Sequence, residues 1–382
     1  MSVWRGLVGQ EAAVATLQRA VAGDMTHAWL LTGPPGSGRS NAAMAFAAAL
    51  QCADGGCGEC QACHTALQGS HRDVSITRTE LLSIGVSGMR DLVLRAALRP
   101  SGDRWQVMIV EDADRLTEQA GDALLKALEE PPPRTVWILC APSVEDVLPT
   151  IRSRTRHVVL ATPSAQAVTD FLVGLGVDRA RAAYAARASQ GHIGRAKALA
   201  TDPATLSRRK MVTELPLELT TPGRCLGAAE NLVNAATEEA KAMTETIDAE
   251  EKDQLDTMFG VVERGRRPKE YAPALKQLTD AQRLRGKRRI LDVIDRGLMD
   301  LVSVYRDAMS RQLGTGAELI NEEMRPQIDA LARRTTAAGN LRRIETIFAA
   351  REQMLEFNVP PLLACESMMI GLHLDESGAI SA

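Results

Sequence analysis

A glycine-rich stretch at residues 30–40 constrains the fold of this chain more than any other feature. It reads LLTGPPGSGRS, and an apolar run at residues 28–31 leads into it while an alanine-rich run at residues 41–50 follows it. These flanks predict a strand, a loop and a helix N-terminus, which is the arrangement of a phosphate-binding loop (P-loop). Glycine lets backbone N–H groups turn toward phosphate oxygens, and the helix dipole favours their negative charge. The predicted nucleotide-binding residues of the loop are Gly33, Pro34, Gly36, Ser37, Gly38, Arg39 and Ser40.

The loop departs from the usual pattern because Arg39 stands where the pattern has lysine. A lysine ammonium is a compact charge that reaches the β- and γ-phosphates, whereas a guanidinium is longer, planar and forked. We therefore expect a loop that holds a nucleotide, or once did, and hydrolyses it poorly. The alternative interpretation is a Gly/Pro turn that binds no ligand.

A second apolar run, residues 105–110, ends in two carboxylates, Glu111 and Asp112. Carboxylates at a strand end complete a nucleotide site, because one holds Mg²⁺ through water and the next polarises the attacking water. The usual order is Asp then Glu, so the two side-chain lengths are exchanged here. A displacement of about 1 Å can cost on the order of a hundredfold in rate. The pair predicts either a slow magnesium site or simply the polar end of a strand.

Four cysteines follow the alanine-rich run at a spacing that suits a metal ion: Cys52, Cys57, Cys60 and Cys63. Four thiolates predict a closed, tetrahedral, structural Zn²⁺ site, and free or disulfide-bonded thiols are the alternative. His64 and His71 lie nearby and are interpreted as surface residues, not ligands. The remaining cysteines are predicted to be core residues: Cys140, Cys225 and Cys365.

The composition is that of a mostly helical protein with two or three domains, since the chain has 382 residues, 45% of them hydrophobic and only 3% aromatic. A formal net charge of -3 argues against a nucleic-acid binder held by its overall field. No window approaches eighteen consecutive apolar residues, and the N-terminus has no signal-peptide pattern. We therefore expect a soluble, cytoplasmic protein with reduced or metal-bound cysteines.

Two further segments complete the pattern. The first lies at residues 124–133, reads LLKALEEPPP and belongs to a predicted helix that ends at the prolines. The second lies at residues 148–155, reads LPTIRSRT and forms most of a predicted short helix over residues 148–156. With the P-loop, the cysteine insertion and the acidic strand end, in this order, the chain resembles the bacterial clamp-loader subunits of the AAA+ class. The resemblance is strong up to about residue 200 and weak beyond it. The altered loop and the exchanged carboxylates resemble the delta prime branch of the DNA polymerase III clamp loader, not the ATP-hydrolysing gamma/tau branch.

The resemblance implies roles for residues outside the loop. In this family a Ser-Arg-Cys motif supplies an arginine finger to the ATP of a neighbouring subunit, and Ser153 and Arg154, followed by Thr155, occupy it here. Arg195 matches the sensor-2 arginine, which reaches a γ-phosphate bound between lid and core. The sensor-1 position, at residues 140–143, has no Asn or Thr, which further weakens hydrolysis.

The expected fold is an α/β P-loop AAA+ core over residues 1–161 with the cysteine module at residues 52–63. A small helical lid over residues 162–205, an all-α collar over residues 206–374 and a disordered tail over residues 375–382 follow. Acidic residues 238–256 are predicted to form a solvated helix. The basic clusters at residues 264–269 and 283–289 are either solvated or contact DNA or a partner.

Two apolar faces are predicted in the collar, either for packing within it or for joining subunits in a ring. The first comprises Ile290, Ile294, Leu298, Leu301, Tyr305 and Met309. The second comprises Leu341, Ile344, Phe348, Arg351 and Leu355, and it ends at residues 358–361.

The favoured functional prediction is a stator of the replicative DNA polymerase III holoenzyme, which helps to load the sliding clamp on primed DNA. Its expected partners are gamma/tau and delta subunits in a hetero-pentameric ring, with the clamp and primer-template DNA reached through that complex and no membrane contact. Structural Zn²⁺ is expected, ATP with Mg²⁺ is bound weakly or no longer bound, and little or no intrinsic ATPase is expected. The alternative is an active ATPase motor subunit of the gamma/tau type. A small-molecule kinase is disfavoured by the cysteine insertion and the long helical tail.

Overall fold

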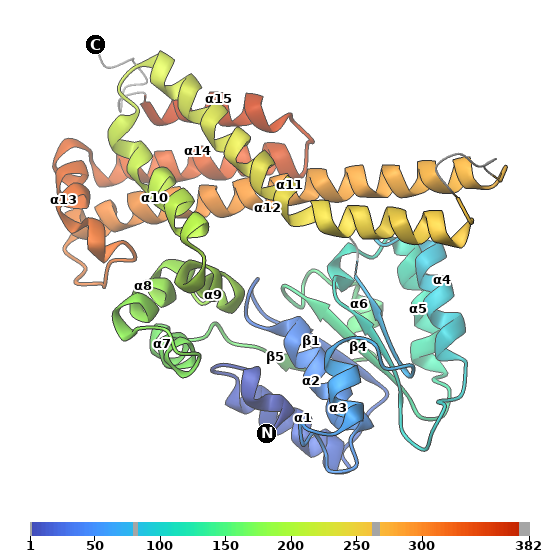
Figure 1. The fold of residues 1–382 in the computed structure, drawn as a ribbon. Coiled ribbons are helices and arrows are strands. Elements are labelled where there is room, and N and C mark those ends of the chain that lie inside the picture. The colour runs from blue at the N-terminus through green and yellow to red at the C-terminus, as the bar shows by residue number, and fades with distance from the viewer. Residues whose placement is uncertain (1, 79–82, 262–267, 374–382) are drawn as a thin grey trace. The chain divides into compact units, whose positions relative to one another are not determined.

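The computed structural model describes residues 2–78, 83–261 and 268–373, and the chain divides into two compact units, Met1–Thr201 and Asp202–Ala382. The first unit holds a sheet and the second is built from helices (Figure 1). Within the described residues, no helix is both long and apolar enough to cross a membrane.

Five parallel strands form one sheet in the order β2-β3-β4-β1-β5. They are β1 (Ala28–Thr32), β2 (Val74–Thr77), β3 (Gln106–Val110), β4 (Thr135–Ala141) and β5 (Arg156–Val159). β1 lies between β4 and β5, with Leu30 opposite Leu139 on one side and His157 on the other. Every residue of β1, β3 and β4 is buried, as expected for parallel strands covered on both faces.

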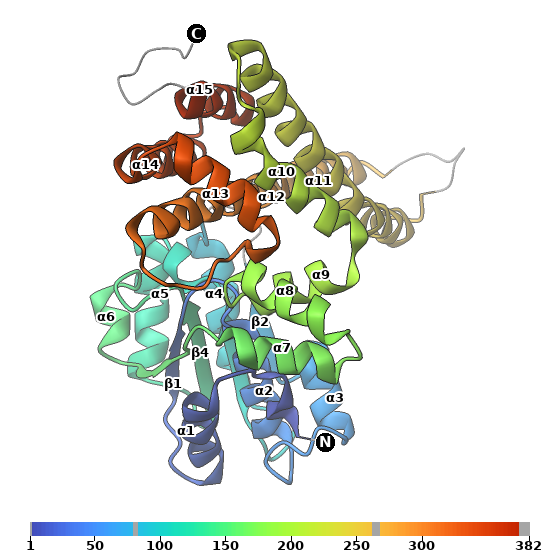
Figure 2. The same ribbon diagram turned by 90° about the vertical axis from the view of Figure 1, so that its left-hand side faces the viewer.

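Helices cover both faces of this sheet (Figure 2). The helices on one face are α1 (Glu11–Ala22), α2 (Arg39–Gln51) and α3 (Gln61–Leu67), and those on the other are α4 (Val86–Ala96) and α5 (Glu118–Glu129). Successive residues of β1 alternate between the two layers: Trp29 meets Phe46 edge-on at 5.3 Å, whereas Leu30 packs with Leu124 on the opposite face. The predicted α/β core is therefore confirmed as a three-layer sandwich.

The predicted strands at residues 28–31 and 105–110 are confirmed, but the helix expected over residues 148–156 is wrong in its second half. α6 (Pro149–Arg152) is a single turn, and Arg156 begins β5. A four-residue edge strand carries too short an alternation to be separated from a helix end by sequence pattern alone. β2 is equally short, and for the same reason the sequence pattern did not predict it.

Three helices follow β5 and share an apolar core of their own: α7 (Ala165–Gly174), α8 (Arg179–Ser189) and α9 (Ile193–Thr201). Side chains cap two of them, because Ser164 accepts from Ala167 N and Asp178 accepts from Ala180 N and Arg181 N. Val168 and Leu172 of α7 pack with Ala185 of α8 and Ala196 of α9 in this cluster.

The regular elements among the described residues of the second unit are all helices, and one apolar core joins the main ones. The helices are α10 (Pro203–Glu218), α11 (Pro222–Met258), α12 (Tyr271–Leu313), α13 (Arg325–Arg334), α14 (Ala337–Leu355) and α15 (Pro361–His373). α11 and α12 form a long antiparallel pair whose far ends extend beyond the other helices of this unit (Figure 1).

The first predicted apolar face is confirmed on α12, where Ile294, Leu298 and Leu301 are buried. The second is not the buried face of α14: Leu341 is 47% exposed and Phe348 is 46% exposed, and Ile347, Ala350 and Met354 are buried in their place. This contradicts the packing of the second face within the collar, and its role in joining subunits stays a prediction. α14 carries apolar residues around most of its circumference, so periodicity alone did not select the buried face.

Charged residues form much of the contact between the outer parts of α11 and α12. Arg285 is 7% exposed, its Nη2 lies 3.1 Å from Asp248 Oδ1, and its Nη1 donates to Glu251 Oε1 at 2.9 Å. Arg296 likewise pairs with Glu239 at 3.3 Å. The acidic helix predicted at residues 238–256 is therefore solvated on one side only. Arg285, in the basic cluster at 283–289, forms ion pairs within the chain. Residues 264–267 of the other cluster lie outside the described residues.

Candidate functional site

The P-loop connects β1 to α2 through two glycines in left-handed conformations. Gly36 has φ +83° and Gly38 has φ +94°, values that other residues adopt only with strain. Ser37 N–H donates to Pro34 O at 3.1 Å, which closes the turn, and Gly33 N–H donates to Pro142 O at 3.1 Å, which joins the loop to the end of β4. The sequence therefore builds the curved backbone that was predicted.

Several polar groups of this loop have no protein partner. Within the described part of the chain, the N–H groups of Gly36, Gly38, Arg39 and Ser40 donate to no acceptor. Ser37 Oγ and Arg39 Nη1 are buried and also lack a hydrogen-bond partner there. A buried polar atom without a partner costs about 1–3 kcal/mol, so the site has free donors that an anion would satisfy. These residues fit a phosphate group.

The acidic strand end lies beside this loop, as predicted. The Ser40 hydroxyl hydrogen-bonds to the Glu111 carboxylate. Burial raises the pKa of Glu111 above its usual range, and the charge of Asp112 adds to this rise, while Arg78 opposes it. Burial likewise raises the pKa of Asp114, and the positive charge of Arg39 partly offsets that rise. The loop cation and three carboxylates thus share one half-buried site.

The start of α9 also contacts the P-loop, at Gly36. Ile193 N–H donates to Gly36 O at 3.3 Å, and the His192 ring covers Gly36. His192 Nδ1 in turn accepts from Arg195 N–H at 3.2 Å, which caps the helix. The predicted sensor-2 residue, Arg195, is therefore two positions from a direct contact with the loop, and its side chain is half-buried.

Sequence reasoning missed Gln10, which ties the P-loop to the segment between β5 and α7. Its side chain is 3% exposed, and its Nε2 donates to Ala161 O at 2.7 Å and to Ser37 O at 3.3 Å. Its Oε1 accepts from Ala161 N–H at 3.0 Å. The only sequence signal was a polar residue at a helix start, which also suits a surface cap. His192 and Asp114 were missed as site residues because nothing near them in sequence indicates the P-loop as their neighbour.

The predicted finger motif lies in a separate part of the same unit. Ser153 caps the C-terminal end of α6 and its hydroxyl donates to Thr150 O at 3.0 Å. The Arg154 side chain is 36% exposed and forms an ion pair with Glu129, with Nη2 2.6 Å from Oε1. No contact joins Arg154 to this chain's own P-loop among the described residues, so the structure does not bring these two predicted sites together.

The four predicted metal ligands do come together. The sulfur atoms of Cys52, Cys57, Cys60 and Cys63 all lie within 4.8 Å of one another, and Cys52 Sγ is 3.6 Å from Cys57 Sγ and 3.7 Å from Cys60 Sγ. Zinc with Zn–S bonds of about 2.3 Å gives a tetrahedron with edges of about 3.8 Å, whereas a disulfide requires about 2.05 Å. The arrangement fits a metal ion and does not fit a disulfide.

Backbone N–H groups point at these sulfurs and favour the thiolate form. Cys57 N–H donates to Cys52 Sγ, and Cys60 N–H donates to Cys57 Sγ, both at 3.4 Å. Burial raises the pKa of Cys52, but the N–H groups of Cys57 and its neighbours outweigh burial and lower it to about 6. His64 is exposed and belongs to no metal cluster of the described residues. Cys140 is fully buried, and burial raises its pKa to about 12, which confirms it as a core residue.

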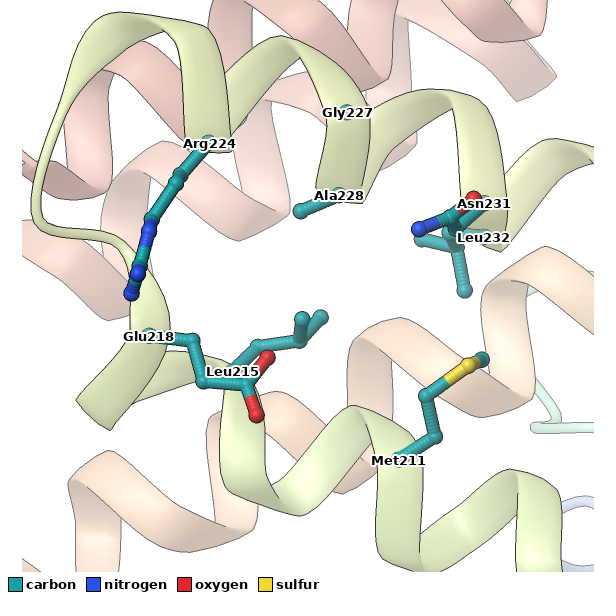
Figure 3. Close-up of a pocket in the computed structure, with 8 residues that line it drawn as sticks. All are labelled: Met211, Leu215, Glu218, Arg224, Gly227, Ala228, Asn231 and Leu232. Atoms are coloured by element: carbon teal, nitrogen blue, oxygen red, sulfur yellow. The ribbon is translucent and has the colours of Figure 1, made fainter.

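A pocket of about 320 Å³ lies in the second unit between α10 and α11 (Figure 3). Met211 and Leu215 line it from α10, and Arg224 and Ala228 line it from α11. None of the predicted site residues lines this pocket.

Comparison with known proteins finds a family match for the first part of the chain. Residues 9–164 match the family model described as DNA polymerase III, delta subunit. This range holds the P-loop, the cysteine cluster, the acidic strand end and Arg154. Over these residues the chain is similar to the DNA polymerase III clamp-loader family.

Curated clamp-loader relatives carry several subunit names. DNA polymerase III subunit gamma/tau of Mycobacterium tuberculosis is 38% identical over 157 residues, which are 40% of this chain and 27% of that protein. DNA polymerase III subunit delta' of Pseudomonas aeruginosa is 37% identical over 152 residues, which are 38% of this chain and 46% of that protein. The chain thus spans less than half of each of these two relatives.

Solved structures resemble this chain at low identity. A DNA polymerase III gamma subunit-related protein from Thermotoga maritima aligns with TM-score 0.35 and 17% identity, over 75% of this chain and 99% of that chain. The DNA clamp loader delta protein of Bacillus subtilis aligns with TM-score 0.33 and 10% identity, over 94% of this chain and 99% of that chain. Both scores lie below 0.5, so these likenesses add nothing to the assignment.

Proposed function

We propose that this chain is a delta prime-type subunit of a DNA polymerase III clamp loader. It acts as a stator: its own P-loop hydrolyses ATP poorly or not at all, and its Arg154 completes the ATP site of a neighbouring subunit. In this proposal residues 1–161 are the AAA+ core, residues 162–205 are the lid and residues 206–374 are the collar through which the subunit joins a ring. Gamma/tau and delta subunits are its partners, and the clamp and primed DNA are reached through the ring.

The position of Arg39 is the observation that carries the proposal. The loop around it keeps free N–H donors, so it still suits a phosphate, but the lysine of an active loop is replaced by a guanidinium beside the Asp114 carboxylate. In hydrolysis a cation must follow the γ-phosphate as its charge develops. A planar, forked guanidinium is poorly suited to that movement. The Ser40 hydroxyl, which would bind Mg²⁺ in an active loop, is already hydrogen-bonded to Glu111.

The exposure of Arg154 supports the second half of the proposal. A finger must project from its own subunit, and Arg154 lies at the surface of the first unit with more than a third of its side chain accessible. There it would add positive charge where the phosphoryl group of a neighbour's ATP develops negative charge, and such fingers contribute about 10³–10⁵ in rate in other systems. The four-cysteine cluster would hold a structural Zn²⁺ in this subunit.

The test measures ATP turnover by this chain alone and by its assembly with gamma/tau-type and delta-type partners, clamp and primed DNA. Wild type is compared with Arg154→Ala and with a matched control, Arg152→Ala, which removes an exposed arginine two positions away. The stator proposal expects no turnover by the chain alone and a loss in the assembly with Arg154→Ala only. Turnover by the chain alone, unaffected by Arg154→Ala in the assembly, would overturn it.

A gamma/tau-type motor subunit is the second candidate, because Mycobacterium gamma/tau is as similar to this chain as the delta' relatives are. An Arg39→Lys variant separates the two. If the chain is a stator, restoring lysine adds turnover to an inactive chain. If it is a motor, wild type is already active and Arg39→Lys changes little.

A further inference from the structure

The Arg154 guanidinium is held by contacts on two of its nitrogen atoms. Nη1 donates to Thr150 O at 2.9 Å and to Ser153 Oγ at 3.2 Å, while Nη2 donates to Glu129 Oε1 at 2.6 Å. A guanidinium has five N–H donors, so Nε–H and one Nη2–H remain. Among the described residues, neither has an acceptor. The side chain is therefore fixed in place while still offering two donors.

Glu129 is anchored by the packing beneath it. It is the last residue of α5, and Gly121 in the same helix lets α6 approach: a Cβ there would lie 2.4 Å from Leu148 Cδ1 and 3.7 Å from Ile151 Cδ1. Ile151 is fully buried. The carboxylate on α5 and the arginine just after α6 are thus set at a fixed separation by the core.

Stability does not explain this pair. An exposed ion pair contributes little to stability, and the Glu129 side chain is 50% exposed. A carboxylate at the C-terminal end of a helix also meets the negative end of the helix dipole, which disfavours it. A neutral or basic residue at this position would therefore give a more stable fold than glutamate.

We propose that Glu129 is a positioning residue for Arg154 in the reaction of the neighbouring subunit. It acts by fixing the flexible arginine before the neighbour's phosphate arrives, so that the rotamer entropy of the arginine is not lost at that step. The inference rests on the proposed arginine finger and adds to it the residue that orients the finger.

The experiment uses the same assembly of full-length subunits, clamp and primed DNA. Glu129→Gln keeps the shape of the side chain and removes its charge. Glu130→Gln is the matched control, because it makes the same change at the next residue, whose exposed side chain forms no ion pair or hydrogen bond with the described residues. We expect Glu129→Gln to lower turnover at saturating ATP by about threefold or more, and Glu130→Gln to leave it unchanged. Glu129→Asp, which keeps the charge but shortens the reach, should fall between Glu129→Gln and wild type.

The double variant distinguishes positioning from a general structural effect. In the Arg154→Ala background, Glu129→Gln should cause no further loss, because the residue through which it acts is gone. If Glu129→Gln is silent or accelerates turnover while Arg154→Ala lowers it, the inference is wrong and the finger stands. An equal loss from Glu129→Gln in both backgrounds also refutes the inference. If Arg154→Ala itself has no effect, the proposed function fails, and the inference fails with it.

Discussion

The imidazole ring of His192 lies so close to Gly36 that a Cβ built on Gly36 would stand 2.1 Å from His192 Cγ. The same glycine has φ +83° and its carbonyl accepts from Ile193 N–H. The turn of the P-loop and the beginning of α9 therefore fit together only with glycine at position 36.

Gly36→Ala should destabilise the first unit for two separable reasons, the positive φ and the overlap with His192. The φ cost is about 1–2 kcal/mol. His192→Ala removes the two ring atoms that would overlap most but keeps its Cβ, which would lie 2.6 Å from the added Cβ, and it leaves the backbone cost unchanged. Gly36→Ala should therefore be less damaging in that background but still destabilising. All four tryptophans, Trp4, Trp29, Trp105 and Trp137, lie in the first unit. Urea unfolding followed by tryptophan fluorescence therefore reports this unit, and an equal penalty in both backgrounds would show that the contact is not rigid.

The purified chain should carry one zinc ion, and Cys60→Ser should remove it. The cysteine loop packs on the N-terminal turn, where Val3 N–H donates to Gly56 O at 3.1 Å, so metal loss should loosen both. We expect the unfolding temperature of the first unit to fall by on the order of 5 °C. Elemental analysis and tryptophan fluorescence measure the two effects. Cys225→Ala, in the core of the second unit, should keep the metal; full zinc content in Cys60→Ser would contradict the site.

Glu111→Gln should stabilise the first unit at neutral pH but not at acidic pH. Burial raises the pKa of Glu111 in the folded state, so the folded chain binds more protons than the unfolded chain between the two pKa values. Stability from this group is complete below the unfolded pKa, about 4.3, and is lost as pH rises through the folded value. The gap between variant and wild-type unfolding midpoints should widen from pH 4 to pH 7.5. Glu145→Gln, at an exposed position, is the control, and a pH-independent gap would contradict the burial of Glu111.

Arg209→Met should severely destabilise the second unit. Arg209 is 3% exposed, its Nε donates to Asp300 at 3.2 Å and its Nη2 donates to Asn321. Removing the arginine leaves Asp300, itself 4% exposed, as a buried charge without this partner, at a cost of about 3–5 kcal/mol. Lys210→Met, at the next position with a side chain 73% exposed, should change stability by less than about 0.5 kcal/mol. Circular dichroism measures both, and similar effects would show that the network contributes little.

The sequence predicted those parts of the fold in which local chemistry and global structure agree. Gly36 and Gly38 are required by the backbone of the loop, and the four cysteines lie close together in sequence, so the sequence predicted both the curved loop and the cysteine cluster. Contacts between distant segments were not predictable in the same way. The Gln10 bridge to Ala161 spans 151 residues of sequence, and no local pattern encodes such a pairing. Likewise the partner of Arg154 is 25 residues away on another helix.

Which residues of α14 are buried within the chain was not predictable for another reason. Phe348 and Leu341 are larger and more apolar than Ala350, yet they are exposed and Ala350 is buried. Hydrophobicity ranks side chains singly, whereas burial depends on which side of the helix faces α12 and α15, and closely packed helices often favour small residues there.

The ion pairs between α11 and α12 have a mechanical consequence. α12 has 43 residues and is therefore roughly 65 Å long. If it slid along α11 by one turn, about 5.4 Å, the nearly buried Arg285 would lose at least one of its two carboxylate partners, Asp248 and Glu251. The ion pairs therefore favour one register of the two helices, and a shift of α12 along its axis would be opposed along the length of the pair.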